Sequence, residues 1–247
     1  MAAIGLKPGD AAVEIGPGQG ALTHRLLEAA GTLEVIEIDR DLAALLRNRY
    51  AGQPRLVVHE ADALQADWRA MAAARGARLR LIGNLPYNIS TPLLFHALKS
   101  ADAILDMHFM LQREVVDRIV AAPGSAAYGR LTVMLAPRIS AERLLDVGPG
   151  AFRPAPKVAS SVVRLVVRDQ LPPWAGSPLY GAVVTAAFGQ RRKTLLTPAR
   201  GLDQQRQPKE QRRRHRRQAN PGCNIAGRTK APFKSGADVA HVGSGGG

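Results

Sequence analysis

The sequence predicts an α/β protein built around a mostly parallel sheet with helices on both faces. Between residues 10 and 168, short β-rich runs alternate with amphipathic helical runs, which is the pattern of β-α-β units. An apolar fraction of 46% is ordinary for a protein with a packed core. A glycine-rich turn follows the first predicted strand, and proteins of this class bind ligands at the carboxyl ends of their strands.

The first part of the chain supplies four of the predicted strands. They cover residues 11–16, 33–39, 55–62 and 78–84, with helices at 21–30 and 40–50. Gly31 follows the first helix directly and is expected to end it. No element is assigned between the third and fourth strands.

The next part continues the same alternation. A helix is predicted at 90–100, with Ser90 or Thr91 as N-cap and Pro92 near the first helical position. A strand at 103–111 and a helix at 113–122 follow. The last predicted elements are strands at 143–148 and 160–167 and a helix at 179–196. After Leu202 there is no leucine and no apolar periodicity, so the end of the chain is expected to be disordered.

The charge balance favours a polyanionic partner. The formal net charge is +14, and the residues after Leu196 contribute eleven Lys/Arg against three Asp/Glu. The first 196 residues therefore carry +6, which is still basic, and nucleic acid is the usual partner of basic proteins.

Other classes of function are disfavoured. A single cysteine excludes an intrachain disulfide framework and a cysteine zinc site, and the six histidines show no metal-ligand spacing. No metal is expected. No apolar run approaches the roughly 18–20 residues of a membrane span, and the first residues do not resemble a secretory signal. We therefore expect a cytoplasmic protein without membrane contact.

The first candidate site is the turn "VEIGPGQGALT", which contains Glu14, Gly16, Gly18 and Gly20. Glycines allow positive φ and close approach of the backbone to a ligand. The spacing G-x-G-x-G differs from the dinucleotide motif G-x-G-x-x-G, which favours a nucleoside cofactor without a pyrophosphate. A simple tight turn would explain the glycines but not the acid.

Two further carboxylates follow the second and third strands. Glu37 is placed to accept both hydroxyl hydrogens of a ribose, with Asp39 as its competitor and a surface ion pair with Arg40 as the structural alternative. Asp62 is placed to accept an exocyclic adenine amine, although a helix-capping role is an alternative.

The fourth candidate is "GNLPYNIST", after the fourth strand. The side-chain oxygen of Asn84 and the carbonyl of Leu85 are two acceptors for one amino group, and Pro86 stiffens the backbone between them and Tyr87. Tyr87 offers a ring on which a flat base stacks. Two acceptors on one –NH₂ hold its hydrogens and free the nitrogen lone pair to attack an electrophilic methyl group.

Eight blocks, from "VEIGPGQGALT" through "GNLPYNIST" and "AFRPAPKVASSVVRL" to "FGQRRKTL", resemble the ribosomal RNA adenine dimethyltransferases, most closely the bacterial type that acts on small-subunit (16S) rRNA. The resemblance covers residues 7 to 196. It implies a Rossmann-like methyltransferase fold with a seven-stranded sheet, S-adenosyl-L-methionine as donor, and N6-dimethylation of two adjacent adenosines near the 3′ end of the rRNA during ribosome biogenesis. The implied partner is the immature 30S subunit, bound by a monomer.

The resemblance also assigns roles to residues. It places the glycine loop against the methionine part of the cofactor, Glu37 on the ribose and Asp62 on the adenine. Phe152 matches an aromatic residue that closes the target pocket. A basic helix implies contacts of Arg191, Arg192 and Lys193 with rRNA phosphates, with a solvated helix end as the alternative. The implied division is a methyltransferase domain at 1–170, a helical remnant at 171–200 and a basic tail at 201–247.

The chain departs from this family at both ends. A "GQNFL"-type segment that precedes the first strand in the family is not found, and "QRRKTL" does not continue into a leucine-containing helical domain. We interpret the change at the C-terminal end as a truncated or frame-shifted reading, and a native basic tail is the alternative. Both departures are expected to weaken cofactor or RNA binding. The alternatives left open are a non-catalytic rRNA-binding or assembly protein, a large-subunit rRNA adenine methyltransferase, and a DNA adenine methyltransferase.

Overall fold

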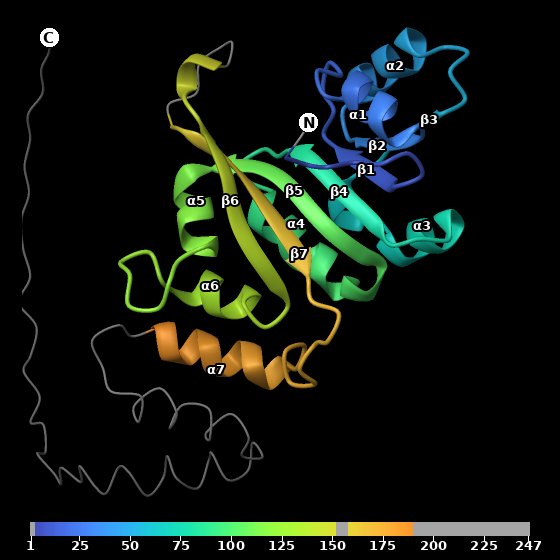
Figure 1. Ribbon diagram of the computed structural model, residues 1–247. Coiled ribbons are helices and arrows are strands. Elements are labelled where there is room, and N and C mark those ends of the chain that lie inside the picture. Colours follow the sequence, from blue (N-terminus) through green and yellow to red (C-terminus); the bar gives the residue numbers. More distant parts are fainter. Residues whose placement is uncertain (1–2, 152–157, 190–247) are drawn as a thin grey trace, which may run out of the picture. The chain divides into compact units, whose positions relative to one another are not determined.

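The computed structural model describes residues 3–151 and 158–189, and it confirms the predicted α/β class. Contacts divide the chain into two units, Met1–Leu202 and Asp203–Gly247, and every described residue belongs to the first. In the described residues, seven strands form one sheet in the order β3-β2-β1-β4-β5-β7-β6 (Figure 1).

The first five strands are parallel to one another. They are β1 (Ala11–Ile15), β2 (Leu33–Glu37), β3 (Leu56–Glu60), β4 (Leu79–Asn84) and β5 (Ile104–Gln112). The last two, β6 (Ile139–Val147) and β7 (Ser160–Val167), form antiparallel pairs, β7 with both β5 and β6. The sheet is therefore mostly parallel, as expected.

Helices cover both faces of the sheet. α1 (Thr23–Ala30) and α2 (Arg40–Arg49) contact β1, β2 and β3. α3 (Trp68–Arg75), α4 (Ser90–Lys99) and α5 (Arg113–Ile119) pack on the other face, and α6 (Arg130–Leu135) lies between α5 and α7 (Pro178–Gly189). Three short 3-10 turns complete the described elements: η1 (Ala63–Gln65), η2 (Ala101–Ala103) and η3 (Pro149–Ala151).

Two hydrophobic cores follow from the alternation of side chains along the strands. In β1, Val13 faces the larger core with Trp68 and Leu93, whereas its neighbour Ala12 faces the smaller core with Leu26 and Leu46 of α1 and α2. Because β1, β2 and β4 supply apolar side chains to both cores, these central strands are nearly continuous apolar runs, as a sheet buried on both faces requires.

Two helices of the structure, α3 and α6, were not predicted from the sequence. The helix α3 is rich in alanine and buries only Trp68 fully, so it has no apolar stripe to detect. Its cap signals were present: Asp67 accepts from the backbone N–H of Arg69 and Ala70, and Gly76 ends the helix in the left-handed conformation. The other helix, α6, has only six residues.

The predicted N-cap of α4 was wrong. Ile89 occupies that position, and no side chain caps the helix. Ser90 is already helical and its hydroxyl donates to the Tyr87 carbonyl at 3.0 Å. The serine therefore fixes the turn that precedes the helix instead of satisfying the first helical N–H groups.

Gly83 brings β1 and β4 unusually close. A Cβ atom there would lie 2.5 Å from the carbonyl oxygen of Ile15, so a side chain at this position would push the two strands apart. The close approach sets the spacing between the glycine loop after β1 and Asn84 at the end of β4. Within the described ranges, no helix is long and apolar enough to cross a membrane.

Candidate functional site

The glycine loop after β1 has the backbone that its sequence requires. Gly16, Gly18 and Gly20 have φ values of +64°, +57° and +83°, which side-chain-bearing residues rarely adopt. The N–H of Gly16 donates to the Ile36 carbonyl at 2.9 Å, which ties the loop to the end of β2. An added Cβ on Gly18 would meet no atom within 4 Å, so the loop presents bare backbone to open space, as a cofactor cradle does.

Glu14 lies beneath this loop with only 2% of its surface exposed. Its carboxylate accepts from the Thr23 hydroxyl at 2.6 Å, at the start of α1. Burial and the charge of Glu37 raise the pKa of Glu14 to about 7, although the bond from Thr23 acts in the opposite direction. Thr23 was missed by the sequence analysis. Its position at the start of the helix after the glycine turn was the available signal.

Replacing Glu14 by glutamine is expected to stabilise the protein at pH 8 and to change little at pH 5. The folded-state pKa is about 7, against 4.5 for an ordinary glutamate, so the folded wild type binds more protons and loses stability as pH rises through this range. The difference between the two proteins at pH 8 should reach about 3 kcal/mol. Urea unfolding at the two pH values measures it.

Glutamine keeps an oxygen that accepts from Thr23, so the comparison isolates the charge. Burial lowers the pKa of His108 to about 4, but this group titrates alike in both proteins and drops out of the difference. A difference in unfolding free energy that stays constant from pH 5 to pH 8 would contradict the assignment.

Glu37 is a buried carboxylate at the end of β2, with 5% of its surface exposed. Its two oxygens accept from the backbone N–H groups of Gly18 and Asp39, each at 3.0 Å. The interpretation as a surface acid paired with Arg40 was therefore wrong. The competitor Asp39 caps α2 by accepting from Asp41 and Leu42, which leaves Glu37 as the carboxylate that faces the glycine loop.

Asp62 follows β3 and begins a 3-10 turn. Its side chain accepts from the backbone N–H of Leu64 at 2.8 Å, so the capping alternative is confirmed. The preceding residue, Ala61, donates to the Glu37 carbonyl at 3.0 Å and holds the ends of β2 and β3 together. The second carboxylate oxygen of Asp62 receives no hydrogen bond from the described residues, so the cap leaves an acceptor for a ligand amine.

Ile38 is an apolar residue that the sequence analysis did not select. It lies directly after Glu37 with 70% of its surface exposed. A single exposed apolar side chain is common in folded proteins, so Ile38 is of interest only because it lies beside Glu37 at this edge, where it offers an apolar surface to a flat group. The run "EID" at the end of the second strand was the signal available in the sequence.

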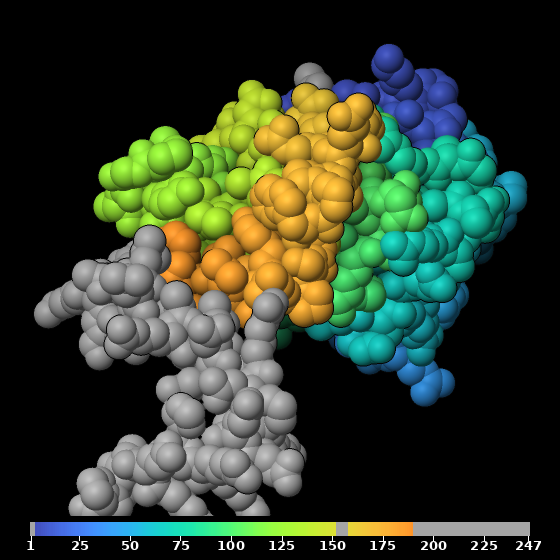
Figure 2. Space-filling model, turned by 90° about the horizontal axis from the view of Figure 1, so that it is seen from below, coloured from blue at the N-terminus to red at the C-terminus, as the bar shows by residue number. Residues whose placement is uncertain are grey.

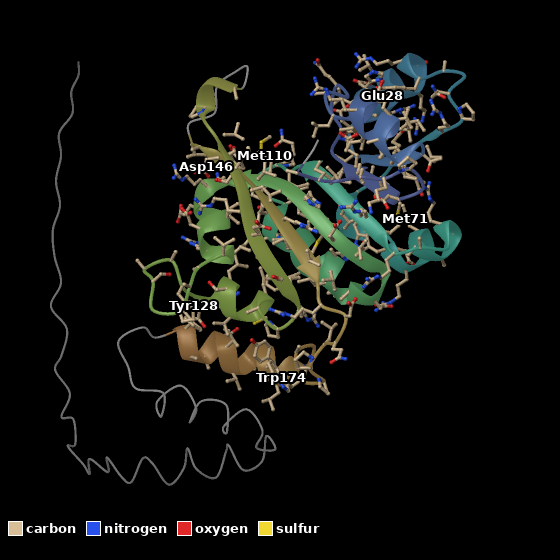
Figure 3. The ribbon with its side chains drawn as sticks, in the orientation of Figure 1. Glu28, Met71, Met110, Tyr128, Asp146 and Trp174 are labelled. Carbon is tan, nitrogen blue, oxygen red and sulfur yellow. The ribbon has the colours of Figure 1, made fainter. Side chains whose placement is uncertain are left out.

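The "NLPY" turn meets the glycine loop at the same edge of the sheet. Asn84 pairs in register with Met110 of β5, labelled in Figure 3 at the carboxyl end of that strand. The position of an added Cβ on Gly16 lies 3.9 Å from the Asn84 carbonyl oxygen, so the two loops are neighbours.

Leu85 and Tyr87 fix the two sides of this turn. The Leu85 side chain is buried, and the Leu85 N–H donates to the Met110 carbonyl at 3.2 Å. The Leu85 carbonyl accepts no hydrogen bond from the described residues. Tyr87 has 42% of its surface exposed, as a ring available for stacking must. The Pro86 carbonyl accepts from Ile89 at 3.2 Å, so the turn is closed independently of any ligand.

Four of the predicted positions thus come together at the carboxyl edge: the glycine loop, Glu37, Asp62 and the "NLPY" turn. Four other predicted site residues lie outside the described residues, so the structure does not test their roles: Phe152, Arg191, Arg192 and Lys193. The edge offers bare backbone, two carboxylates and an exposed apolar side chain on one side, and two neutral acceptors beside an aromatic ring on the other. Such a site suits a nucleoside cofactor next to a planar amine.

Comparison with known proteins gives one family match. The model of the family "Ribosomal RNA adenine dimethylase" matches residues 1–232. The chain is 57% identical over 203 residues to the ribosomal RNA small subunit methyltransferase A of Methylococcus capsulatus, covering 82% of this chain and 78% of that protein. It is 55% identical over 202 residues to the protein of the same name from Laribacter hongkongensis, covering 81% and 76%.

Two solved structures have a similar fold. One is a dimethyladenosine transferase from Plasmodium falciparum, with a TM-score of 0.68 and 28% identity, covering 80% of this chain and 70% of that one. The other is the 23S rRNA methyltransferase ErmE, with a TM-score of 0.66 and 28% identity, covering 85% and 81%.

Proposed function

We propose that this chain, which belongs to the ribosomal RNA adenine dimethylase family, transfers methyl groups from S-adenosyl-L-methionine to the N6 atoms of two adjacent adenosines near the 3′ end of small-subunit rRNA. The observation that carries the proposal is the meeting of Asn84 with the glycine loop at one sheet edge. Relatives at 49–57% identity are named for the small subunit, which favours that substrate over the large subunit.

The residues at the carboxyl edge fit S-adenosyl-L-methionine. One Glu37 carboxylate oxygen accepts from Gly18 of the glycine loop and the other from Asp39 before α2, and a carboxylate with two acceptor oxygens at this place suits a ribose diol. Asp62 keeps a free acceptor for the adenine amine, and Ile38 offers an apolar surface to the ring. The glycine loop leaves room for the methionine part. When bound, the cofactor supplies a methyl carbon attached to a sulfonium, which is electrophilic without help from a metal.

The chain's own contribution is the placement of the attacking amine. The Asn84 side-chain oxygen and the Leu85 carbonyl accept the two N6 hydrogens, which turns the nitrogen lone pair out of conjugation with the ring. Tyr87 fixes the plane of the base by stacking. As the N–C bond forms and the S–CH₃ bond of the donor breaks, its electron pair stays on sulfur as a neutral thioether; the nitrogen becomes cationic and both acceptors stabilise it. The proton then leaves to water, so no buried general base is required.

The partner that we propose is the immature 30S subunit, bound by a monomer in the cytoplasm. We also propose that Phe152 closes the target pocket and that Arg191, Arg192 and Lys193 contact rRNA phosphates. The division at residues 170 and 200 is part of the same proposal. The support for these assignments is the agreement of the sequence blocks with the family.

A methyl-transfer assay with the full chain tests the proposal. Incubation with labelled S-adenosyl-L-methionine and unmethylated small subunits should label two adjacent adenosines near the 3′ end, up to four methyl groups per subunit. Subunits that already carry these methyl groups should accept none. Absence of label from unmethylated subunits, with cofactor binding intact, would favour the non-catalytic alternative. Label confined to large subunits would contradict the substrate.

A further inference from the structure

A basic cavity of about 350 Å³ lies at the amino edge of the sheet, at the opposite ends of the strands from Asn84. It is lined by the start of α3, the segments that lead into β4, β5 and β6, and the segment that follows β7. Figure 2 shows this side of the molecule, where the orange segment after β7 lies beside the teal and green segments around α3 and η2.

The cavity carries an excess of positive charge. Five cationic side chains line it against two carboxylates, which gives a formal net charge of +3; they are Arg69, Arg78, Lys99, Arg138 and Arg168 against Asp102 and Asp169.

Both carboxylates are already neutralised within the cavity. Arg69 binds Asp102 through contacts of 2.7–3.1 Å, and Arg78 binds Asp169 at 3.0 Å. In the described part of the chain no carboxylate pairs with Lys99, Arg138 or Arg168. These three cations are therefore the charge that remains for a ligand.

The backbone holds two of the unpaired guanidinium groups in place. Arg138 donates to the Leu98 carbonyl at 2.9 Å, and Arg168 donates through Nε to the Ala136 carbonyl at 3.1 Å. A guanidinium has five N–H donors, so each group keeps most of its donors while its position is fixed. Fixed guanidinium groups suit oxyanions such as phosphate, because little conformational freedom is lost on binding.

The larger described cavity, between α4, α5 and α6, serves as a comparison. It measures about 700 Å³, and two acids balance two arginines there: Glu114 and Asp117 against Arg118 and Arg130. The amino-edge cavity therefore carries an excess of positive charge that the larger cavity does not have.

We propose that the amino-edge cavity binds the sugar–phosphate backbone of RNA, at a segment of the rRNA remote from the target adenosines. The inference rests on the proposed function only for the choice of RNA as the polyanion. A substrate as large as a ribosomal subunit offers phosphates far from the reacting base, and contacts with them orient the enzyme without reading sequence.

Removal of two exposed cations tests the proposal. The double variant Lys99→Gln/Arg168→Gln is compared with Arg25→Gln/Arg55→Gln, which removes the same charge from exposed positions of α1 and the segment before β3. Each lost phosphate contact lowers the slope of log K against log salt by about 0.7–0.9. The first variant should therefore lose about 1.5 units of slope and bind unmethylated small subunits about tenfold more weakly, whereas the control should stay near wild type.

Methyl transfer gives a second measurement. In the Lys99→Gln/Arg168→Gln variant, KM for the subunit should rise while kcat and cofactor affinity stay unchanged. Equal RNA affinity and equal salt slopes in the two double variants would overturn the proposal. If the Lys99→Gln/Arg168→Gln variant kept RNA binding but lost the binding of vesicles that contain phosphatidylglycerol, the proposal would also be overturned, and the cavity would be assigned to a membrane surface.

Gly176→Ala separates geometry from net charge. A Cβ atom on Gly176 would lie 2.8 Å from a terminal nitrogen of Arg138, so the variant displaces that guanidinium without changing the charge. It should weaken RNA binding at low salt, and unchanged binding would remove Arg138 from the site. If the wild type binds RNA with salt dependence but transfers no methyl group, the proposed function fails and the cavity assignment stands.

Discussion

Asn84→Ala is expected to lower kcat for methyl transfer by about 10²–10³-fold and to leave cofactor affinity unchanged. The substitution removes the side-chain acceptor that stabilises the amine as it becomes cationic, whereas the backbone contacts around Gly16 and Met110 stay. Because Asn84 is exposed at the end of β4, its loss should cost little stability. Single-turnover rates with saturating cofactor and calorimetric cofactor binding measure the two quantities separately.

Asn48→Ala is the matched control for this substitution. Asn48 is an exposed asparagine on α2, away from the carboxyl-edge turn, and its replacement should leave both kcat and cofactor affinity at the wild-type values. A normal kcat for Asn84→Ala would remove the assigned role of this side chain. A parallel loss of cofactor affinity would place Asn84 on the cofactor instead of the target amine.

Arg80→Leu is expected to lower the free energy of unfolding by about 3–5 kcal/mol, the cost of breaking a buried ion pair from one side. Arg80 is 7% exposed and forms two bonds to Asp106, at 3.0 and 2.8 Å. It also binds Asp10 at 2.7 Å and the carbonyls of Gly5 and Ile4. The substitution leaves the buried Asp106 carboxylate without its partner and releases the segment before β1.

Urea unfolding followed by the fluorescence of the buried Trp68 measures this loss. Arg78→Leu is the control, because Arg78 is exposed and, among the residues that the structure describes, pairs only with the exposed Asp169, so its loss should cost less than about 1 kcal/mol. The double variant Arg80→Leu/Asp106→Leu should be more stable than Arg80→Leu alone, since no uncompensated charge remains. Equal stability of the two variants would contradict the buried-charge explanation.

The strands and the place of the candidate site at the carboxyl edge were predictable because their signals are local. Apolar runs predicted β1 to β5 to within one or two residues at most ends. The glycine turn after β1 and the polar residues Glu37, Asp62 and Asn84 at the ends of the next three strands were then expected at one edge of a parallel sheet. The turns "GPGQG" and "NLPY" each depend on a few consecutive residues, so Asn84 and the glycine loop could be proposed as site residues without knowledge of the fold.

Contacts between distant residues could not be predicted in this way. Arg80 forms hydrogen bonds to partners that are 26, 70, 75 and 76 positions away in the sequence. No periodicity in the sequence predicts such pairs. The choice of Glu37 over Asp39 depended on which carboxylate the chain uses as a cap. The basic cavity collects charges from five separate segments, each of which alone looks like a solvated surface.

The sequence by itself determined the α/β class, the order of the first five strands along the chain and the residue types at the carboxyl edge. Only the tertiary structure decided that Glu14 is buried with a raised pKa, that Gly83 sets the spacing of β1 and β4, and that cations gather at the amino edge. The physical reason is that propensity and turn chemistry act between neighbours in sequence. Burial, desolvation and electrostatic fields depend on every group nearby in space, whatever its place in the chain.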